Sequence, residues 1–154
     1  MAVYYLDTSA LVKRYALESG TSWVMRLTNP ASGHDLYTVH LTGPEMMAAL
    51  FRKARTGAIS RAEAIRLSGN FEVDWKKQYQ IVEVSPQVAD RAMVLIKEHT
   101  LRGHDAVHLA AALALHDLRC AMKLPALVFV SADDEQLRAA EAKGLPTENP
   151  NQYP

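Results

Sequence analysis

Four acidic residues occupy positions where an expected strand gives way to an expected helix. Asp7 directly follows the first apolar run of the chain, and Asp133 follows a late apolar run in a similar way. Glu45 and Asp105 each fall in the first turn of an expected helix. In a parallel sheet, the turns that follow the strands lie along one edge, so Glu45 should approach Asp7. Asp105 joins them if its helix begins on that edge.

A cluster of four carboxylates carries an electrostatic cost that indicates its chemistry. Two unit charges about 4 Å apart repel by roughly 4 kcal/mol at an effective dielectric of 20, so clustered acids do not all stay ionised unaided. Mg²⁺ or Mn²⁺ relieves this repulsion and prefers oxygen ligands. In such a site the cation activates water and neutralises charge on a phosphodiester under attack. Each acid taken alone is explained as a helix cap, but four together favour a metal site.

The elements that position these acids alternate between strands and helices. Strands are expected at residues 3–6, 35–40, 80–84 and 126–130. Helices are expected to begin near Ser9, Thr21, Pro44, Ser60, Pro86, His104 and Asp134, with Gly69 and Asn70 as a candidate break in the fourth. This alternation predicts an α/β fold with a mainly parallel sheet covered by helices on both faces.

Length and composition are those of an ordinary globular domain. With 154 residues, 49% hydrophobic and 22% charged, the chain is large enough to bury one core without disulfides. We expect a single domain over residues 1–146, with the Pro-rich residues 147–154 as a loose tail. A lone cysteine, Cys120, and the absence of a signal-peptide pattern or a membrane-length apolar run favour a cytoplasmic protein.

The overall charge gives no attraction for polyanions, since 17 basic residues balance 17 acidic ones. Local basic clusters partly restore the case for nucleic acid. Lys13, Arg14 and Arg52 are candidates to hold an RNA backbone, although a solvated helix face is the favoured explanation for such clusters.

Four motifs in order resemble the signatures of PIN domains, especially the VapC-type ribonuclease toxins of toxin-antitoxin pairs. They are "YLDTSALVKRY", the Glu of "LTGPEMMAAL", "LRGHDAVHLAAAL" and "VFVSADDEQLRAAEAKGL", and the likeness spans about Val3 to Leu145. Each motif is weak alone, but the set is specific.

The resemblance implies a three-layer α/β/α sandwich, PIN-like, with the metal held by Asp7, Glu45, Asp105 and Asp133. Ser9 and Ser131 match small hydroxyl positions that support these acids. Asp134 has two interpretations, a helix-capping acid or an auxiliary ligand. The resemblance further implies Mg²⁺- or Mn²⁺-dependent endoribonuclease activity, inhibition by a cognate antitoxin protein, and a homodimer. It leaves open the RNA that is cleaved and the number of metal ions.

Three other functions compete with this interpretation. A His-Asp metal phosphohydrolase would use imidazole ligands, for which the candidates are His99, His104, His108 and His116. That site needs an all-helical scaffold, whereas this chain opens with a strand. A phosphoacceptor signalling domain would want a lysine after a late strand, and "VFVSADDEQ" has none. A non-catalytic PIN-like module that binds RNA or protein remains as the alternative, although retention of all four acids argues against it.

Overall fold

The computed structural model describes all residues from 1 to 154 and shows a five-stranded parallel sheet. The strand order is β3-β2-β1-β4-β5. The strands are β1 (Val3–Leu6), β2 (Asp35–Val39), β3 (Gln80–Val82), β4 (Leu127–Val130) and β5 (Thr147–Glu148). The central strand β1 therefore pairs with β2 on one side and with β4 on the other. The predicted parallel sheet is confirmed.

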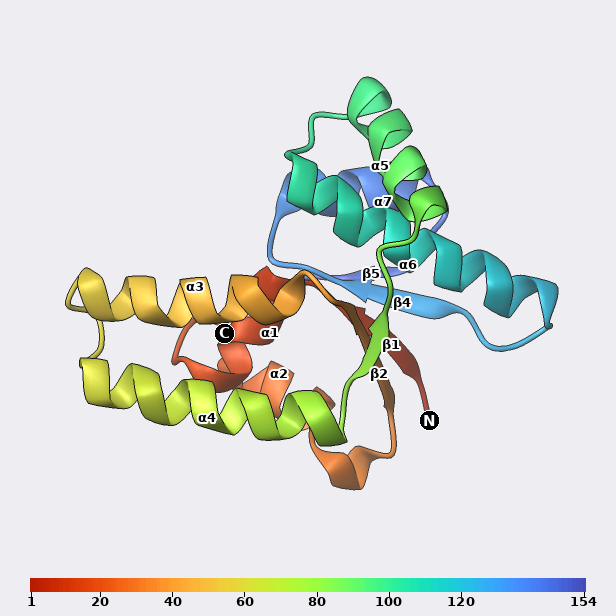
Figure 1. The fold of residues 1–154 in the computed structure, drawn as a ribbon. Helices are drawn as coiled ribbons and strands as arrows, with labels where there is room; N and C mark the ends of the chain where they lie inside the picture. Colours follow the sequence, from red (N-terminus) through yellow and green to blue (C-terminus); the bar gives the residue numbers. More distant parts are fainter.

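Helices cover both faces of this sheet, which confirms the predicted three-layer arrangement (Figure 1). One layer contains α1 (Thr8–Tyr15), α2 (Thr21–Leu27), α3 (Thr42–Arg55) and α4 (Arg61–Lys77). The other contains α5 (Pro86–Glu98), α6 (Gly103–Ala121) and α7 (Asp134–Ala142). None of these helices is long and apolar enough to cross a membrane.

Two hydrophobic cores lie between the three layers, and the strands contribute to both. Alternate side chains of a strand point to opposite faces, so Tyr5 packs in the core beneath α5 and α6 while Leu6 packs beneath α1 and α3. Both side chains have no solvent exposure. Burial on two faces explains why the central strands β1 and β4 are continuous apolar runs without polar alternation.

Helix α4 runs unbroken through Gly69 and Asn70, where the sequence suggested a break. Its inner face explains the continuity, because Ala64, Leu67 and Phe71 are all buried against the neighbouring helices. Tertiary packing of this stripe outweighs the roughly 1 kcal/mol by which glycine disfavours a helix interior.

The C-terminal residues 147–154 are structured, in contrast to the loose tail expected from their composition. Thr147 and Glu148 form β5 beside β4, and residues 150–152 form a 3-10 turn. The ring of Tyr153 stacks on Trp23 of α2, with centroids 4.8 Å apart. A strand of two residues carries no periodic signal, so the pattern of the sequence could not show it.

Gly20 lies at the start of α2, where the C-terminal segment packs closely against the backbone. It has φ +86°, and a Cβ there would lie 2.3 Å from the carbonyl oxygen of Pro150. Gly57 has a similar φ of +80°, but a Cβ there meets nothing within 4 Å. We expect Gly57→Ala to cost about 1 kcal/mol of unfolding free energy, and Gly20→Ala to cost roughly 2–4 kcal/mol because a clash adds to the same backbone strain. Urea unfolding measures both; equal losses would contradict the close approach of Pro150.

Candidate active site

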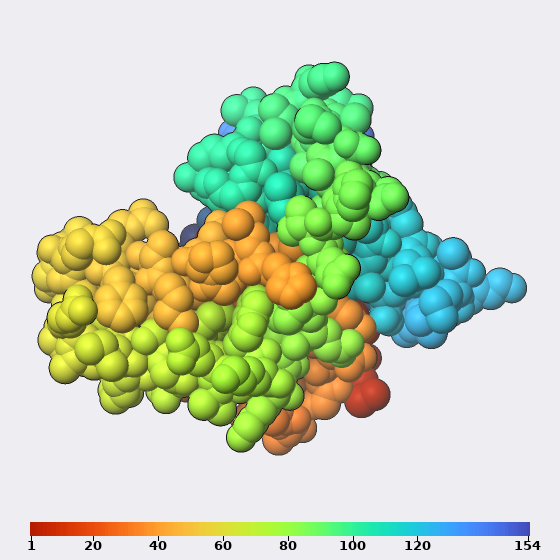
Figure 2. Space-filling model, in the orientation of Figure 1, coloured from red at the N-terminus to blue at the C-terminus, as the bar shows by residue number.

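A cleft of about 370 Å³ opens beyond the carboxyl ends of β1 and β4, between α3 and the start of α6. The surface is visibly indented between these two helices (Figure 2). All four acids proposed from the sequence line this cleft: Asp7, Glu45, Asp105 and Asp133. Its wall also carries Thr8, Ser9, Arg52, Arg102, His104 and His108. The fold thus brings together residues that are far apart in the chain.

Asp7 lies at the base of the cleft and is only 4% exposed. Its backbone N–H donates to the carbonyl of Val130, which continues the pairing of β1 with β4. One carboxylate oxygen caps α1 by accepting the N–H of Ala10 and the hydroxyl of Ser9, at 3.1 and 2.8 Å. Burial raises the pKa of Asp7 to about 6, an effect that nearby His108 and these hydrogen bonds only partly offset. Asp7 is therefore a helix cap that also presents a desolvated carboxylate to the cleft.

Ser9 and Ser131 tie Asp7 to the turn after β4. The Ser131 hydroxyl lies 3.2 Å from the second carboxylate oxygen of Asp7 and accepts the N–H of Asp133 at 3.0 Å. The Ser9 hydroxyl accepts the N–H of Ala132 at 2.9 Å. The two serines thereby connect the loops that carry two of the acids.

Glu45 extends from the first turn of α3 and is held by His108 and Thr8. His108 Nε2 lies 2.6 Å from Glu45 Oε1, and the Thr8 hydroxyl donates to the same oxygen at 2.9 Å. Partial burial by itself would raise the pKa of Glu45, but the hydrogen bond and charge of His108 lower it below its usual value. Because a carboxylate only accepts, His108 Nε2 is the donor, and its Nδ1 faces the hydroxyl of Tyr5 at 3.2 Å.

Asp105 and Asp133 meet at Arg102, the residue that directly precedes α6. Arg102 Nε donates to Asp105 Oδ2 at 2.9 Å, and a terminal nitrogen of its guanidinium lies 3.7 Å from Asp133 Oδ2. The other oxygen of Asp133 caps α7 by accepting the N–H groups of Glu135 and Gln136. One carboxylate oxygen of Asp133 thus caps α7, and the other faces the guanidinium of Arg102.

Sequence reasoning missed the roles of His108 and Arg102. The sequence offers His108 only as a candidate imidazole ligand of a phosphohydrolase, whereas in the structure it is 1% exposed and lies against Glu45. A usable signal was its spacing of three residues from Asp105, which places both side chains on one face of α6. Arg102 also lies three residues from Asp105, but its contact with Asp133 is long-range and leaves no local signal in the sequence.

Other residues singled out in the sequence lie outside the cleft. Asp134 is exposed, and its carboxylate accepts from Asn149 at 3.1 Å, which leaves an auxiliary metal role without geometric support. Lys13 is 4% exposed and paired with Glu18 at 3.1 Å. Of the three basic residues proposed to hold RNA, only Arg52 lines the cleft.

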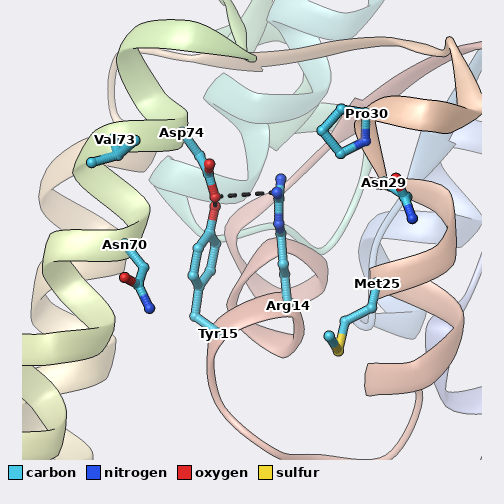
Figure 3. A pocket seen from close by; sticks show the side chains of 8 residues that line it. All are labelled: Arg14, Tyr15, Met25, Asn29, Pro30, Asn70, Val73 and Asp74. Atoms are coloured by element: carbon cyan, nitrogen blue, oxygen red, sulfur yellow. Dashed lines mark hydrogen bonds and ion pairs between the residues drawn. The ribbon is translucent and has the colours of Figure 1, made fainter.

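Arg14 belongs to a separate hollow of about 500 Å³ between α1, α2 and α4 (Figure 3). Its guanidinium pairs with Asp74 at 3.2 Å and donates to the Tyr79 hydroxyl at 2.6 Å. The Tyr15 hydroxyl donates to the same Asp74 at 2.8 Å. Since these polar groups satisfy one another, they link α1 to α4. The acid-lined cleft is therefore the better candidate for chemistry.

The cleft has the oxygen donors that a divalent cation prefers, but its acids are engaged with protein partners. No group of three or more His, Cys, Asp or Glu side chains is already arranged to hold an ion. Two of the acids face Arg102, whose side chain is 69% exposed and can therefore move aside at little cost. The donor chemistry fits Mg²⁺ or Mn²⁺, with Arg102 as the counter-charge that would have to be displaced.

Comparison with known proteins identifies the family. The chain is 33% identical over 144 residues to the ribonucleases VapC45 and VapC49 from two strains of Mycobacterium tuberculosis, which covers 94% of this chain and 93% of each relative. The chain belongs to the VapC family of PIN-domain proteins. No family model matches it. The resemblance recognised in the sequence motifs is therefore confirmed by full-length similarity.

Three solved structures share the fold. A VapBC2 complex from Rickettsia felis, bound to a DNA fragment from its promoter, contains a chain that matches with a TM-score of 0.63 at 12% identity, covering 96% of this chain and 98% of that one. A toxin-antitoxin complex from Klebsiella pneumoniae matches at 0.56 and 16% identity, covering 97% and 98%. FitAcB from Neisseria gonorrhoeae matches at 0.55 and 12%, covering 96% and 97%. These likenesses establish the architecture of this VapC-family chain.

Metal-free stability should depend on pH through Asp7. Its folded pKa of about 6 lies above the ordinary 3.8, so its contribution is favourable at low pH and is lost as the pH rises from about 4 through about 6. At about 1.36 kcal/mol per pKa unit, Asp7→Asn should be more stable than the unsubstituted protein by up to about 3 kcal/mol near pH 7.5 and no more stable near pH 4. Urea unfolding in EDTA at both pH values measures this; a variant less stable than the unsubstituted protein at pH 7.5 would contradict the raised pKa of Asp7.

Proposed function

We propose that this protein is an Mg²⁺- or Mn²⁺-dependent endoribonuclease, the toxin of a VapBC-type toxin-antitoxin pair. The observation that carries the proposal is the gathering of Asp7, Glu45, Asp105 and Asp133 around one cleft. Full-length similarity to proteins named as VapC ribonucleases supports it. The proposed substrate is RNA, and the proposed reaction is hydrolysis of a phosphodiester bond.

The four acids are the proposed ligands of the cation, which when bound supplies water activation and charge neutralisation at the phosphate. The protein's own groups orient these ligands. Ser9 and Ser131 fix the two oxygens of Asp7, while His108 and Thr8 fix Glu45. Since His108 already donates to Glu45, it serves as an orienting group and is not free to act as a general base.

The cleft shape and its charges are consistent with a strand of RNA entering between α3 and α6. Arg52 stands on the α3 wall, where a guanidinium can hold a phosphate by two parallel hydrogen bonds. Lys13 and Arg14 are committed to Glu18 and Asp74, so they do not share this role. A chain without net charge would thus bind RNA through a local site.

An antitoxin protein and a second copy of the chain are the proposed protein partners, with the cytoplasm as the proposed location. Two of the structural neighbours are named as toxin-antitoxin or VapBC complexes, which supports the antitoxin. The homodimer rests on the family alone. The alternative, a PIN-like module that binds RNA or protein without cleaving it, shares the same cleft and is separated by the cleavage assay below.

Cleavage of RNA should require both the metal and the acids. We expect the purified protein to cleave single-stranded RNA in Mg²⁺ or Mn²⁺ and to be inactive in EDTA. The Asp7→Asn variant should cleave more than roughly 100-fold more slowly, because replacing even a partner of a metal ligand typically lowers activity 10–100-fold. Asp117→Asn is the matched control, because Asp117 lies on α6 with a 61% exposed side chain paired to Arg91 outside the cleft. Binding of RNA without any cleavage would favour the non-catalytic module.

Metal binding should also stabilise the fold, because only the folded chain assembles the four acids. A ligand at 100 times its dissociation constant adds about 2.7 kcal/mol, so millimolar Mg²⁺ or Mn²⁺ should raise the melting temperature by several degrees. Asp105→Asn should reduce this increase, and Asp117→Asn should preserve it. If neither metal changes the melting temperature of the unsubstituted protein, the metal site is refuted.

A further inference from the structure

Arg102 reaches from the start of α6 across the mouth of the cleft to two of the four acids. Its guanidinium contacts Asp105 on its own helix and Asp133 on the turn after β4. The Arg102 side chain is 69% exposed, whereas that of Asp105 is 9% exposed. One exposed guanidinium, that of Arg102, therefore links the nearly buried Asp105 to the more accessible Asp133.

This guanidinium neutralises the same carboxylates that a divalent cation would neutralise. Without a cation, clustered acids need another counter-charge, and Arg102 supplies one positive charge to two of them. Asp105 and Asp133 would be among the residues that hold a divalent cation, and its charge would compete with the guanidinium for their oxygens. Because Arg102 is largely exposed, releasing it into water costs little free energy, as is usual for accessible ion pairs.

Release does not carry Arg102 away from the cleft. Its carbonyl accepts the N–H of Ala106 at 3.0 Å, so its backbone is part of the first turn of α6. The freed guanidinium stays at the cleft mouth, opposite the α3 wall that carries Arg52. A planar guanidinium at that place suits a phosphate oxygen pair better than a lysine would.

We propose that Arg102 is a positioning residue that holds Asp105 and Asp133 in the metal-free protein and transfers to a phosphate of the RNA when a divalent cation binds. This inference rests on the proposed ribonuclease function. It predicts two opposed effects of one side chain, since Arg102 competes with the metal and assists the RNA. Metal and RNA should therefore bind with positive coupling, because each is favoured when Arg102 has left the acids.

The test compares Arg102→Gln and Arg102→Lys with the control Arg66→Gln. Arg66 is 64% exposed and paired with Glu63 three residues away on α4, so it matches Arg102 in exposure and spacing but lies outside the cleft. Mn²⁺ affinity is measured by calorimetry without RNA. KM and kcat are then measured in saturating Mn²⁺ with a short single-stranded RNA.

We expect Arg102→Gln to bind Mn²⁺ roughly threefold to tenfold more tightly, because it lacks the competing ion pairs. Its KM for RNA should rise about tenfold with a smaller change in kcat, reflecting one lost charge-assisted phosphate contact. Arg102→Lys, which retains a positive charge, should lie between Gln and the unsubstituted protein in both measurements. Arg66→Gln should behave as the unsubstituted protein.

Unchanged or weaker Mn²⁺ binding by Arg102→Gln would overturn the inference, since it would make Arg102 a fixed support of the acids. An unchanged KM would also overturn it. If the unsubstituted protein binds Mn²⁺ and cleaves RNA while Arg102→Gln matches it in both, the inference fails and the proposed function stands. If the unsubstituted protein neither binds Mn²⁺ nor cleaves RNA, both the proposed function and this inference are wrong.

Discussion

The need to compensate four carboxylates gathered at one cleft is the constraint on which the rest of the site depends. The protein meets it separately for each acid. Asp7 accepts hydrogen bonds from Ser9 and Ala10, but these only partly offset burial, which raises its pKa to about 6. Glu45 is paired with a buried imidazole, that of His108. The remaining two acids share the exposed guanidinium of Arg102. Only this last compensation involves a largely exposed side chain, so it is the one most easily undone.

The sheet topology explains why the acids meet in one place. Strand β1 lies at the centre, with β2 on one side and β4 on the other. The helix after β2 packs on one face of the sheet, and α6 packs on the opposite face. The chain therefore leaves a crevice beyond the carboxyl ends of the strands, as open α/β sheets do where the strand order reverses. Asp7 stands at the base of that crevice, and the two helices present their first turns from either side.

Two of the acids that line the cleft are also helix caps. Asp7 and Asp133 both cap helices through one carboxylate oxygen and present the other toward the cleft or its serines. A cap needs an acceptor at the start of a helix, and a cation site needs an oxygen beyond a strand, so one residue satisfies both. The choice between a cap and a catalytic acid is therefore not exclusive at either position.

The sequence by itself determined the alternation of strands and helices, the parallel sheet and the placement of four acids at helix starts, because periodicity, capping residues and strand-end acids are local signals. Only the tertiary structure decided the partners of those acids. The contacts of His108 with Glu45 and of Arg102 with Asp133 join residues 63 and 31 positions apart in the chain. The tertiary structure also decided that α4 continues through Gly69, because its buried face packs against neighbouring helices. It likewise decided that β5 forms, because β5 pairs with the edge of β4. Side-chain pairing across elements depends on packing that no local pattern encodes.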